Sequence, residues 1–557
     1  MTDQPVAGTA EPPVRTARIL AALMVPLFMA LLALSVINVA LPVIGRDLQS
    51  DTSGLQWVVS GYALAFGLLL VPSGRLGDAS GRKRLFLAGV AVFVVGAVIA
   101  GLAPSIEMLN LARLLQGVGS GMLNPQTFGL IQKYFSGEAR ARAFATMATT
   151  VSVATASGPL IGGLLIEALG DDLGWRAMFL VNVPLGILAL VLGQRWLPDD
   201  RRLARPALPP ALSRARAREL TRLDKATRQG KDVGQNQDQD QDQNLDDDDN
   251  ATADNAVRAA GVAASGGAAL PATPPRRRRA RLDLDPVGIV LLGVAVLSLM
   301  LPFLSGGDSA LMWLLVPVGL GFMAAFVWWE RRYERIGSEP LVNPEIFRDT
   351  AFRNGMMIVS IYFVGGTSLW IVMPIYLQFH LGYAPIDSAW ISLPASICAA
   401  VSAQVAGRFV LRAGRRMVIA GFSLTITALL TFIVLAGFVD SGDLNYLFFM
   451  VPAAMVGIAQ GMTISPNQTL TLRAVNPEFG GVAGSIISLG QRMGTAVGTA
   501  IVPGVLFWIV ATSGDWVLAF RSSIGLIALL AAMALAVAVV DRRREARAAA
   551  AASSAPA

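Results

Sequence analysis

The chain has 557 residues, of which 54% are hydrophobic and 15% are charged, and its formal net charge is +7. Its apolar runs repeatedly exceed the roughly 20 residues that a helix needs to cross a bilayer, which indicates a membrane protein with many spans. The single cysteine, Cys398, and the single histidine, His380, exclude a disulfide framework, a cysteine-based metal site and any site that needs two histidines. We therefore expect an all-α integral membrane protein with no metal and no cofactor.

Hydropathy predicts about fourteen transmembrane helices along the chain. The first apolar run follows Arg15 and Arg18 and is too long for the core of a cleaved signal peptide, so we interpret it as a retained helix. The predicted helix cores are residues 19–44, 55–73, 85–103, 108–130, 143–168, 177–196, 286–305, 311–329, 355–378, 389–410, 417–438, 446–466, 483–510 and 517–540.

Lys and Arg are distributed unevenly between the predicted loops. The loops after even-numbered helices and the C-terminal tail are rich in cations, whereas the opposite loops carry almost none. Because short cytoplasmic loops are enriched in Lys and Arg, we expect both termini in the cytoplasm and a multi-pass protein of the cell membrane. This asymmetry accounts for the positive net charge, so we expect the lipid bilayer as a partner and no nucleic acid.

The loop after the second helix, "GRLGDASGRKR" from Gly74, has a counterpart in "GRFVLRAGRRM" from Gly407. Four positions agree at identical spacing: Gly74 and Gly407, Arg75 and Arg408, Gly81 and Gly414, Arg82 and Arg415. This repeat predicts two six-helix units with the same orientation, plus two extra central helices. Two such units would enclose a cavity near the bilayer midplane that opens to either side in turn.

A polar stripe marks the fourth predicted helix. Arg113 lies in an apolar segment, where a cation is costly and must face protein or water. At about 100° per residue, it shares a stripe of roughly 80° with four polar residues. The stripe, which we predict to line the cavity, is Arg113, Gln116, Ser120, Asn124 and Thr127. The alternative is a structural cation bound to carbonyl groups near the helix end.

The thirteenth predicted helix has a similar stripe that contains one arginine. Its members are Ser485, Ser488, Arg492, Thr495 and Thr499. We predict that Arg492 and Thr495 line the cavity from this side, and that Asn38 lines it from the first helix. In the fifth helix, Gly158 and Pro159 permit a kink, and the glycines there permit close helix contact.

Residues 198–283 do not fit the membrane pattern, because they change from basic to Gln- and Asp-rich and back to basic. We predict a disordered cytoplasmic linker. It is either a tolerated insertion without a specific role, or its arginine blocks bind the acidic tract or anionic lipid. The expected domains are a cytoplasmic tail at 1–18, a six-helix half at 19–197, the linker at 198–283, two extra helices at 284–330, a second half at 331–540 and a cytoplasmic tail at 541–557.

These features resemble the major facilitator superfamily, and specifically its fourteen-helix drug:proton antiporter branch. The matching motifs are "VINVALP" from Val36, "GRLGDASGRKR" from Gly74, "RLLQG" from Arg113, "SGPLIGG" from Ser157 and "GWRAMFLVNVPLG" from Gly174. The resemblance covers nearly the whole chain except the termini and the linker. It implies a gating loop built by Gly74, Asp78, Gly81 and Arg82. It also implies a hinge at Gly158, Pro159, Gly162 and Gly163, although ordinary helix packing would equally account for the glycines.

The chain departs from that branch in the first helix, where Ala33 stands at the place of a common acidic residue. No Asp or Glu lies in the middle of a predicted helix, so the candidates for proton coupling are Glu107, Glu167 and Asp78 near helix ends. With Arg113 and Arg492 as the central charges, the cavity should prefer neutral or anionic amphiphiles. His380 and Asp387 could titrate as a pair, or His380 could be a solvated loop residue.

The sequence therefore predicts a secondary active transporter that works as a monomer. We expect it to export small amphiphilic drugs or metabolites by alternating access, in exchange for protons. The alternative is a dedicated exporter of one endogenous metabolite or lipid that is not coupled to protons. An enzyme is disfavoured, because no nucleophile, base or metal cluster converges on one face.

Overall fold

The computed structural model describes residues 13–198, 285–304, 310–336, 338, 340–473 and 475–553, which belong to one compact unit. All but one residue of the predicted linker at 198–283 lies outside the described residues, as does the chain before residue 13. The described part contains helices and no strands. The predicted all-helical membrane fold is therefore confirmed.

The helices up to residue 198 are α1 (Pro13–Ser35), α2 (Ile37–Asp47), α3 (Thr52–Ser80), α4 (Arg82–Gly101), α5 (Ile106–Tyr134), α6 (Gly137–Leu180) and α7 (Asn182–Trp196). The two that follow the linker are α10 (Pro286–Leu304) and α11 (Leu315–Arg335), with the short turn η2 (Ala310–Leu314) between them. The remainder are η3 (Pro344–Arg348), α12 (Thr350–Gly366), α13 (Leu369–Ile375), η4 (Tyr376–His380), α14 (Pro385–Ala413), α15 (Arg415–Asp440), η5 (Tyr446–Phe449), α16 (Met450–Arg473), η6 (Pro477–Phe479), α17 (Gly480–Ser513) and α18 (Trp516–Ser553).

Each of the fourteen predicted segments is helical, although only twelve described stretches are apolar and long enough to be recognised as membrane spans. One of the twelve, Gly137–Trp196, contains the fifth and sixth predicted helices, which are separated at Gly170 with its φ of 79°. The other missing span is α5, whose polar residues are buried inside the protein.

Two helices predicted as continuous are broken, and this is a correction. Residues 19–44 form α1 and α2 with a break at Val36, and residues 355–378 are interrupted before α13 at Ser368. Each break lies six residues before a proline, Pro42 or Pro374. A proline lacks the N–H that would bond to the carbonyl group four residues earlier, which weakens the helix on that side.

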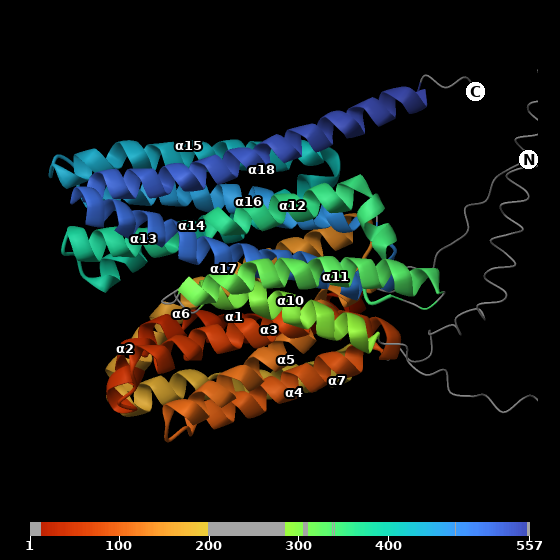
Figure 1. Ribbon diagram of the computed structural model, residues 1–557, viewed down its shortest axis with the longest axis horizontal. Coiled ribbons are helices and arrows are strands. Elements are labelled where there is room, and N and C mark those ends of the chain that lie inside the picture. Colours follow the sequence, from red (N-terminus) through yellow and green to blue (C-terminus); the bar gives the residue numbers. More distant parts are fainter. Residues whose placement is uncertain are drawn as a thin grey trace, which may run out of the picture. The chain divides into compact units, whose positions relative to one another are not determined.

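Figure 1 shows α1 to α7 as one group and α12 to α18 as a second group, with α10 and α11 between them. The first group and the second group meet where α6 packs against α14 and α16, and where α17 packs against α3 and α5. Helix α10 contacts both α3 and α17, so it covers the seam between these two helices. The start of α1 and the end of α18 lie at the same end of the helices in Figure 1, which we call the terminal end.

At the opposite end, the motif that begins at Gly174 ties α6 to α2. The indole of Trp175 donates a hydrogen bond to Asp47 at 2.9 Å, and Arg176 forms an ion pair with the same carboxylate at 3.4 Å. Trp175 is fully buried, and the Arg176 guanidinium lies 4.4 Å from its ring centre. This motif therefore has a structural task in fixing the end of the broken first helix.

Candidate functional site

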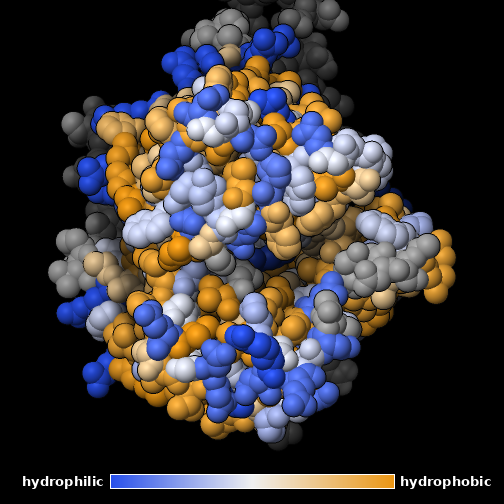
Figure 2. Space-filling view, turned by 90° about the vertical axis from the view of Figure 1, so that its left-hand side faces the viewer, coloured by the Kyte–Doolittle hydropathy of each residue, from blue (hydrophilic) through white to orange (hydrophobic). Residues whose placement is uncertain are grey.

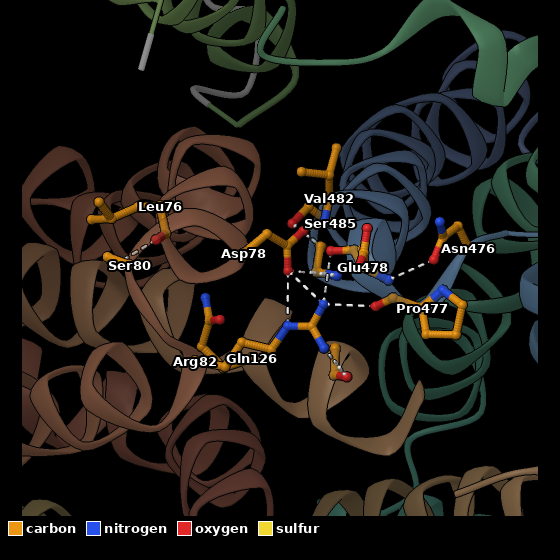
Figure 3. A network of polar contacts seen from close by, with 12 residues as sticks. Leu76, Asp78, Ser80, Arg82, Gln126, Asn476, Pro477, Glu478, Val482 and Ser485 are labelled. Carbon is orange, nitrogen blue, oxygen red and sulfur yellow. Dashed lines mark hydrogen bonds and ion pairs between the residues drawn. The ribbon is translucent and has the colours of Figure 1, made fainter. Parts of the chain in front are cut away.

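The segment from Gly74 that was predicted as a loop is mostly helical, because α3 continues to Ser80 and α4 begins at Arg82. This segment, which we still call the loop, lies at the terminal end, against the start of α17. The side chain of Asp78 is only 4% exposed, and it accepts hydrogen bonds from the backbone N–H groups of Gly481 at 3.3 Å and Val482 at 3.0 Å (Figure 3). These are among the first residues of α17, whose free N–H groups and helix dipole favour a negative charge. Asp78 is thus bound to a helix of the other group.

Arg82 completes this contact from the start of α4. Its guanidinium donates to Asp78 at 2.8 Å and to the carbonyl oxygens of Pro477 at 2.8 Å and Glu478 at 3.0 Å (Figure 3). It also donates to the carbonyl oxygen of Gly129 in α5 at 2.5 Å. The buried pair therefore links α3, α4 and α5 to η6 and α17.

Two glycines of the loop are required by the geometry. Gly81 has a φ of 108°, a region that other residues rarely adopt, and it lets α4 follow α3 directly. A Cβ atom on Gly74 would collide with the side chain of Ser485 and would stand 2.9 Å from the carbonyl oxygen of Gly481. The four predicted gating residues are thus brought together at one contact between α3 and α17.

The counterpart segment in the second group also packs against the first group, because a Cβ atom on Gly407 would collide with Ala145 of α6. The arginine of this segment has different partners from Arg82. Arg415, which matches Arg82, forms an ion pair with Asp541 of α18 at 2.6 Å. It also donates to Asn467 in α16 at 2.6 Å and to the carbonyl oxygen of Ala351 in α12 at 3.2 Å. All these partners belong to the second group.

Arg113 is completely buried in the first group. Its guanidinium donates to the carbonyl oxygens of Val58 at 2.9 Å and Ala33 at 3.5 Å, and to the side chain of Gln116 at 2.8 Å. It also lies 4.4 Å from the ring centre of Tyr62, a residue that the sequence did not single out. Arg113 thus has carbonyl partners, as expected for a structural cation, and also a polar partner from the predicted stripe. Ala33, which stands at the place of a common acidic residue, lies directly beside it.

The predicted stripe on α5 divides between two environments. Ser120 is buried and shares a hydrogen bond of 2.7 Å with the hydroxyl group of Tyr62. Asn124 instead faces the second group, where it accepts a hydrogen bond from Ser488 of α17 at 3.0 Å. Thr127 is buried and donates to the carbonyl oxygen of Leu123 in its own helix. The side chain of Asn38 lies outside the described part.

Arg492 has a different environment from Arg113. Its guanidinium lies 4.5 Å from the ring centre of Phe66, which is itself 6.1 Å from the ring of Tyr62. Among the described residues, Arg492 makes no hydrogen bond and no ion pair. One turn further along α17, the hydroxyl group of Thr495 lies 3.4 Å from that of Thr367. Two aromatic rings of α3 thus lie between the two central arginines.

The residues of α17 near the terminal end bind the first group, whereas those further along the helix are less enclosed. From the terminal end, Gly481 and Val482 bind Asp78, and Ser488 binds Asn124. Arg492 follows one turn later and is only partly buried. The surface at the opposite end is hollowed between the two groups of helices (Figure 2). The first and second groups are therefore joined at the terminal end and separated at the other.

The proline of the predicted hinge has a specific partner in the first helix. Pro159 has no N–H to donate to the carbonyl group of Thr155, four residues earlier. The hydroxyl group of Ser35 donates to this carbonyl oxygen at 2.6 Å. Ser35 is the last residue of α1 and stands next to the break in the first helix, so the kink of α6 and the break of α1 are joined by one hydrogen bond.

The glycines of the predicted hinge differ in their surroundings. A Cβ atom on Gly158 would meet the side chain of Ser35 at 2.5 Å, and one on Gly162 would meet Val36 at 3.0 Å. Gly163 has no atom of another segment within 4 Å of that position. Two of the glycines therefore permit close packing on the broken first helix, whereas Gly163 faces open space.

The predicted proton-coupling carboxylates are not brought together. Glu107 is exposed in the first turn of α5, and Glu167 is exposed near the opposite end of α6. Neither is among the partners of Arg113. Asp78 is the buried one of the three, and it lies at the contact between the two groups.

His380 and Asp387 do not form a pair. His380 lies 2.6 Å from Asp440 at the end of α15, and its ring stacks on Trp516 at 5.6 Å between centres. Asp387 accepts hydrogen bonds from the hydroxyl group of Tyr446 at 2.6 Å and from the N–H of Ala384 at 3.0 Å. The histidine thus joins two helices and is not a free loop residue.

The sequence model described as the Major Facilitator Superfamily matches residues 23–228 and 355–556 of this chain. The "Probable actinorhodin transporter" of Streptomyces coelicolor is 28% identical over 90% of this chain and 74% of that protein. "Multidrug resistance protein Stp" of Mycobacterium tuberculosis and the "Tetracenomycin C resistance and export protein" of Streptomyces glaucescens are each 27% identical, over 87% of this chain and 75% of each relative.

Two solved structures share the fold at low sequence identity. The human organic anion transporter MFSD10 (TETRAN) superposes with a TM-score of 0.57 and 12% identity, over 95% of this chain and all of that one. The proton:xylose symporter XylE, bound to 6-bromo-6-deoxy-D-glucose, gives a TM-score of 0.58 and 12% identity, over 93% of this chain and 95% of that chain.

Proposed function

Because this chain belongs to the Major Facilitator Superfamily, we propose that the contacts described above are one stage of an export cycle for small amphiphilic compounds. The protein is a secondary transporter of the cell membrane that exports small compounds, and it is not an enzyme. We propose which end of the protein faces the cytoplasm, which compounds it exports and that protons drive the export.

The terminal end is the cytoplasmic side in this proposal. It carries many cations, which include Arg82, Lys83, Arg84, Arg331, Arg332, Arg335, Arg415, Arg416, Arg542, Arg543 and Arg544. Short cytoplasmic loops are enriched in such residues, so both termini are cytoplasmic. The closed contact of Asp78 and Arg82 with α17 then seals the cytoplasmic side, and the hollow in Figure 2 faces outward. Opening that contact and closing the hollow gives the inward-facing form.

The substrates are small amphiphilic compounds that are neutral or carry an anionic group. The observation that carries this assignment is the guanidinium of Arg492, which has no hydrogen-bond or ion-pair partner among the described residues and stands over Phe66. A cation without a counter-ion inside a membrane protein is costly unless water or a ligand meets it. An anionic group would pair with Arg492. The rings of Tyr62 and Phe66 are buried and already lie against Arg113 and Arg492.

A dedicated exporter of one endogenous compound is the second candidate. Two of the relatives are named after a single compound, actinorhodin or tetracenomycin C, whereas Stp is named as a multidrug resistance protein. A competition assay with a panel of unrelated aromatic acids separates the two, because a dedicated exporter is inhibited by one chemical series alone.

Export is driven by proton entry, and one chain is the working unit. Asp78 is the candidate carboxylate at an interface that must open in the cycle. Proteoliposomes with an imposed pH gradient test this: coupled export accelerates with the gradient, and equal rates with and without it would refute proton coupling.

The substrate assignment is tested by replacing Arg492. We expect Arg492→Gln to slow export of an anionic aromatic compound about tenfold to a hundredfold, since a hydrogen bond to a charged group contributes about 1.5 to 3 kcal/mol. A neutral analogue of the same ring system should be affected far less. The matched control is Arg521→Gln, because Arg521 donates to the carbonyl oxygen of Ile433 in another part of the second group. Equal loss for both compounds would contradict the anion site.

A further inference from the structure

Two buried carboxyl groups face each other where α10 begins and α11 ends. Asp285 is fully buried and Glu330 is 3% exposed. One oxygen of Asp285 accepts hydrogen bonds from the N–H of Gly288 at 3.0 Å and from the indole of Trp329 at 2.8 Å. One oxygen of Glu330 accepts from the N–H of Val342 at 3.3 Å. The pair therefore connects α10, α11 and the segment before α12.

The second oxygen of each carboxyl group has no hydrogen-bond partner in the described part of the chain. These two oxygens point to one place, because a Cβ atom built on Gly288 would collide with Asp285 Oδ2 and would stand 2.8 Å from Glu330 Oε1. Only a glycine at position 288 leaves room for both. Two acceptor atoms that face each other without a donor are costly when buried.

No cation neutralises the pair within the described residues. The charged residues with described side chains on or beside α3, η3, α11, α12 and α17 are Arg75, Asp78, Arg331, Arg332, Glu334, Arg335, Arg348, Asp349, Arg353 and Arg492. The side chain of Glu345 in η3 lies outside the described part. Arg331, Arg332, Glu334 and Arg335 are exposed, and none of these side chains forms an ion pair with Asp285 or Glu330.

We propose that Asp285 and Glu330 form a proton-binding site that holds one proton between them while the cytoplasmic side is closed. Two carboxylates that share a buried site cannot both ionise at low cost, and one retained proton supplies the missing donor. The resulting O–H···O hydrogen bond satisfies both orphan oxygens and leaves a single negative charge. Deprotonation places two negative charges against each other and releases one proton to water.

The position of the pair connects this proton to the gate. α10 covers the seam between α3 and α17, which is also the seam that Asp78 and Arg82 close. Leu341 and Val342, beside Glu330, belong to the same buried apolar cluster as Val482 of α17. When α3 and α17 separate, α10 can remain packed on only one of them, so water reaches the pair and the proton leaves on the cytoplasmic side.

Infrared difference spectroscopy of the full chain in nanodiscs tests the site. The wild-type protein should show the C=O stretch of a protonated carboxyl group at neutral pH, and Glu330→Gln should remove it. Glu334→Gln, one turn further on α11 and exposed, is the matched control and should leave the band unchanged. If Glu330→Gln removes no band, both groups are ionised and the proposal fails.

A second variant and a second measurement keep the test decisive if Glu330→Gln folds poorly. Asp285→Asn should remove the same band, because the amide N–H₂ donates to Glu330 and no second carboxyl group then prevents Glu330 from ionising. The melting temperature of the wild type should fall as the pH rises through the neutral range, because the folded protein holds a proton that the unfolded chain releases. A wild-type melting temperature with the same pH dependence as that of Glu330→Gln would overturn the site.

The release step rests on the alternating access proposed above, whereas the infrared band requires neither substrate nor transport. Asp78→Asn weakens the closed contact, so in this variant the band should titrate at lower pH than in the wild type. A band that is present but unaffected by Asp78→Asn would overturn the link to the gate. Its absence in the wild type would overturn the proton site while leaving the export function standing.

Discussion

The two copies of the glycine- and arginine-rich loop each turn at a glycine with positive φ, Gly81 or Gly414, but their charged residues have different partners. In the first copy, Arg82 pairs with Asp78 four residues earlier, and this pair reaches across to α17. In the second copy, Leu411 stands at the position of Asp78, and Arg415 pairs with Asp541 at the far end of the chain. Both copies pack against the other half through their first glycine, Gly74 or Gly407. The ion pair of the first copy binds the other half, whereas the ion pair of the second copy stays within its own half.

In the export cycle proposed above, this difference makes the charged contact of one copy movable and that of the other copy permanent. The contacts of Asp78 with the start of α17 are hydrogen bonds to backbone groups that water can replace when the halves separate. The pair of Arg415 with Asp541 is buried, with exposures of 0% and 2%, among helices of one half. Breaking the second should therefore damage the fold, and breaking the first should damage the cycle.

The largest effect is expected for Asp541→Ala. It leaves the buried guanidinium of Arg415 without its counter-ion, which costs about 3 to 5 kcal/mol in comparable pairs. We expect most of the protein to be lost from the membrane fraction, as measured by detergent extraction and size-exclusion chromatography. Normal yield and melting temperature would contradict a permanent role. The double variant Arg415→Leu with Asp541→Leu should recover part of the yield, because it removes both charges.

Arg113→Ala should abolish export while membrane abundance stays near normal. The guanidinium of Arg113 is bound by backbone carbonyl groups of Val58 and Ala33, and no carboxylate is left unpaired by its removal. Arg113→Lys should be partly active at best, since an ammonium group cannot reproduce the planar fork of donors. Uptake of labelled substrate into inverted vesicles, normalised to protein amount, gives the measurement. Export at the wild-type rate by the alanine variant would exclude Arg113 from the transport path.

Asp78→Asn should leave the fold intact and shift the balance between the two forms. It removes a charged acceptor from the start of α17, and such hydrogen bonds contribute about 1.5 to 3 kcal/mol, or about a tenfold to hundredfold change in the equilibrium. Gln132, buried at the same contact, offers a reporter position. In a Cys398→Ser background that also carries Gln132→Cys, the new thiol should react faster with a thiol reagent when Asp78→Asn is present than when it is absent. Unchanged labelling would separate Asp78 from the gate.

The smallest effect is expected for Leu411→Asp, which gives the second copy the acidic residue of the first. Arg415 is already paired with Asp541, and Leu411 is exposed, so the new carboxylate gains little. We expect a change in stability within about 1 kcal/mol, as for other exposed ion pairs, and an unchanged export rate. A large gain or loss of export would contradict this expectation, because it would show that the second loop also affects transport.

The sequence predicted the helical fold and the repeat because both depend on local properties. Apolar run length marks the spans, and identical spacing marks the two loops. The polar stripe on α5 was also visible, although the same polarity lowered the hydropathy of that helix. The roles of the site residues themselves stay predictions, which the variants above address.

The parts that could not be predicted depend on partners far apart in the chain. Ser35 donates to the carbonyl group that Pro159 leaves unbonded, and Tyr62 lies against Arg113. Asp541 pairs with Arg415. No sequence motif indicates which residue each of these side chains contacts. Asp285 and Glu330 lie near the ends of two separate helices. Pro42 and Pro374 stand at the same distance beyond the two breaks, but prolines also lie inside unbroken helices such as α3 and α5, so a proline alone does not predict a break.

The paired breaks at Val36 and Ser368 give each half a separate outer segment, α2 or α13. In the export cycle proposed above, α2 tilts over a bound molecule together with the part of α6 that is bound to Asp47, while the contact of Asp78 with α17 stays closed. The transporter then adopts a form that is closed on both sides of the membrane. A carrier that visits this sealed form moves its cargo without ever offering ions a continuous water path, so the membrane gradient that drives it is not short-circuited.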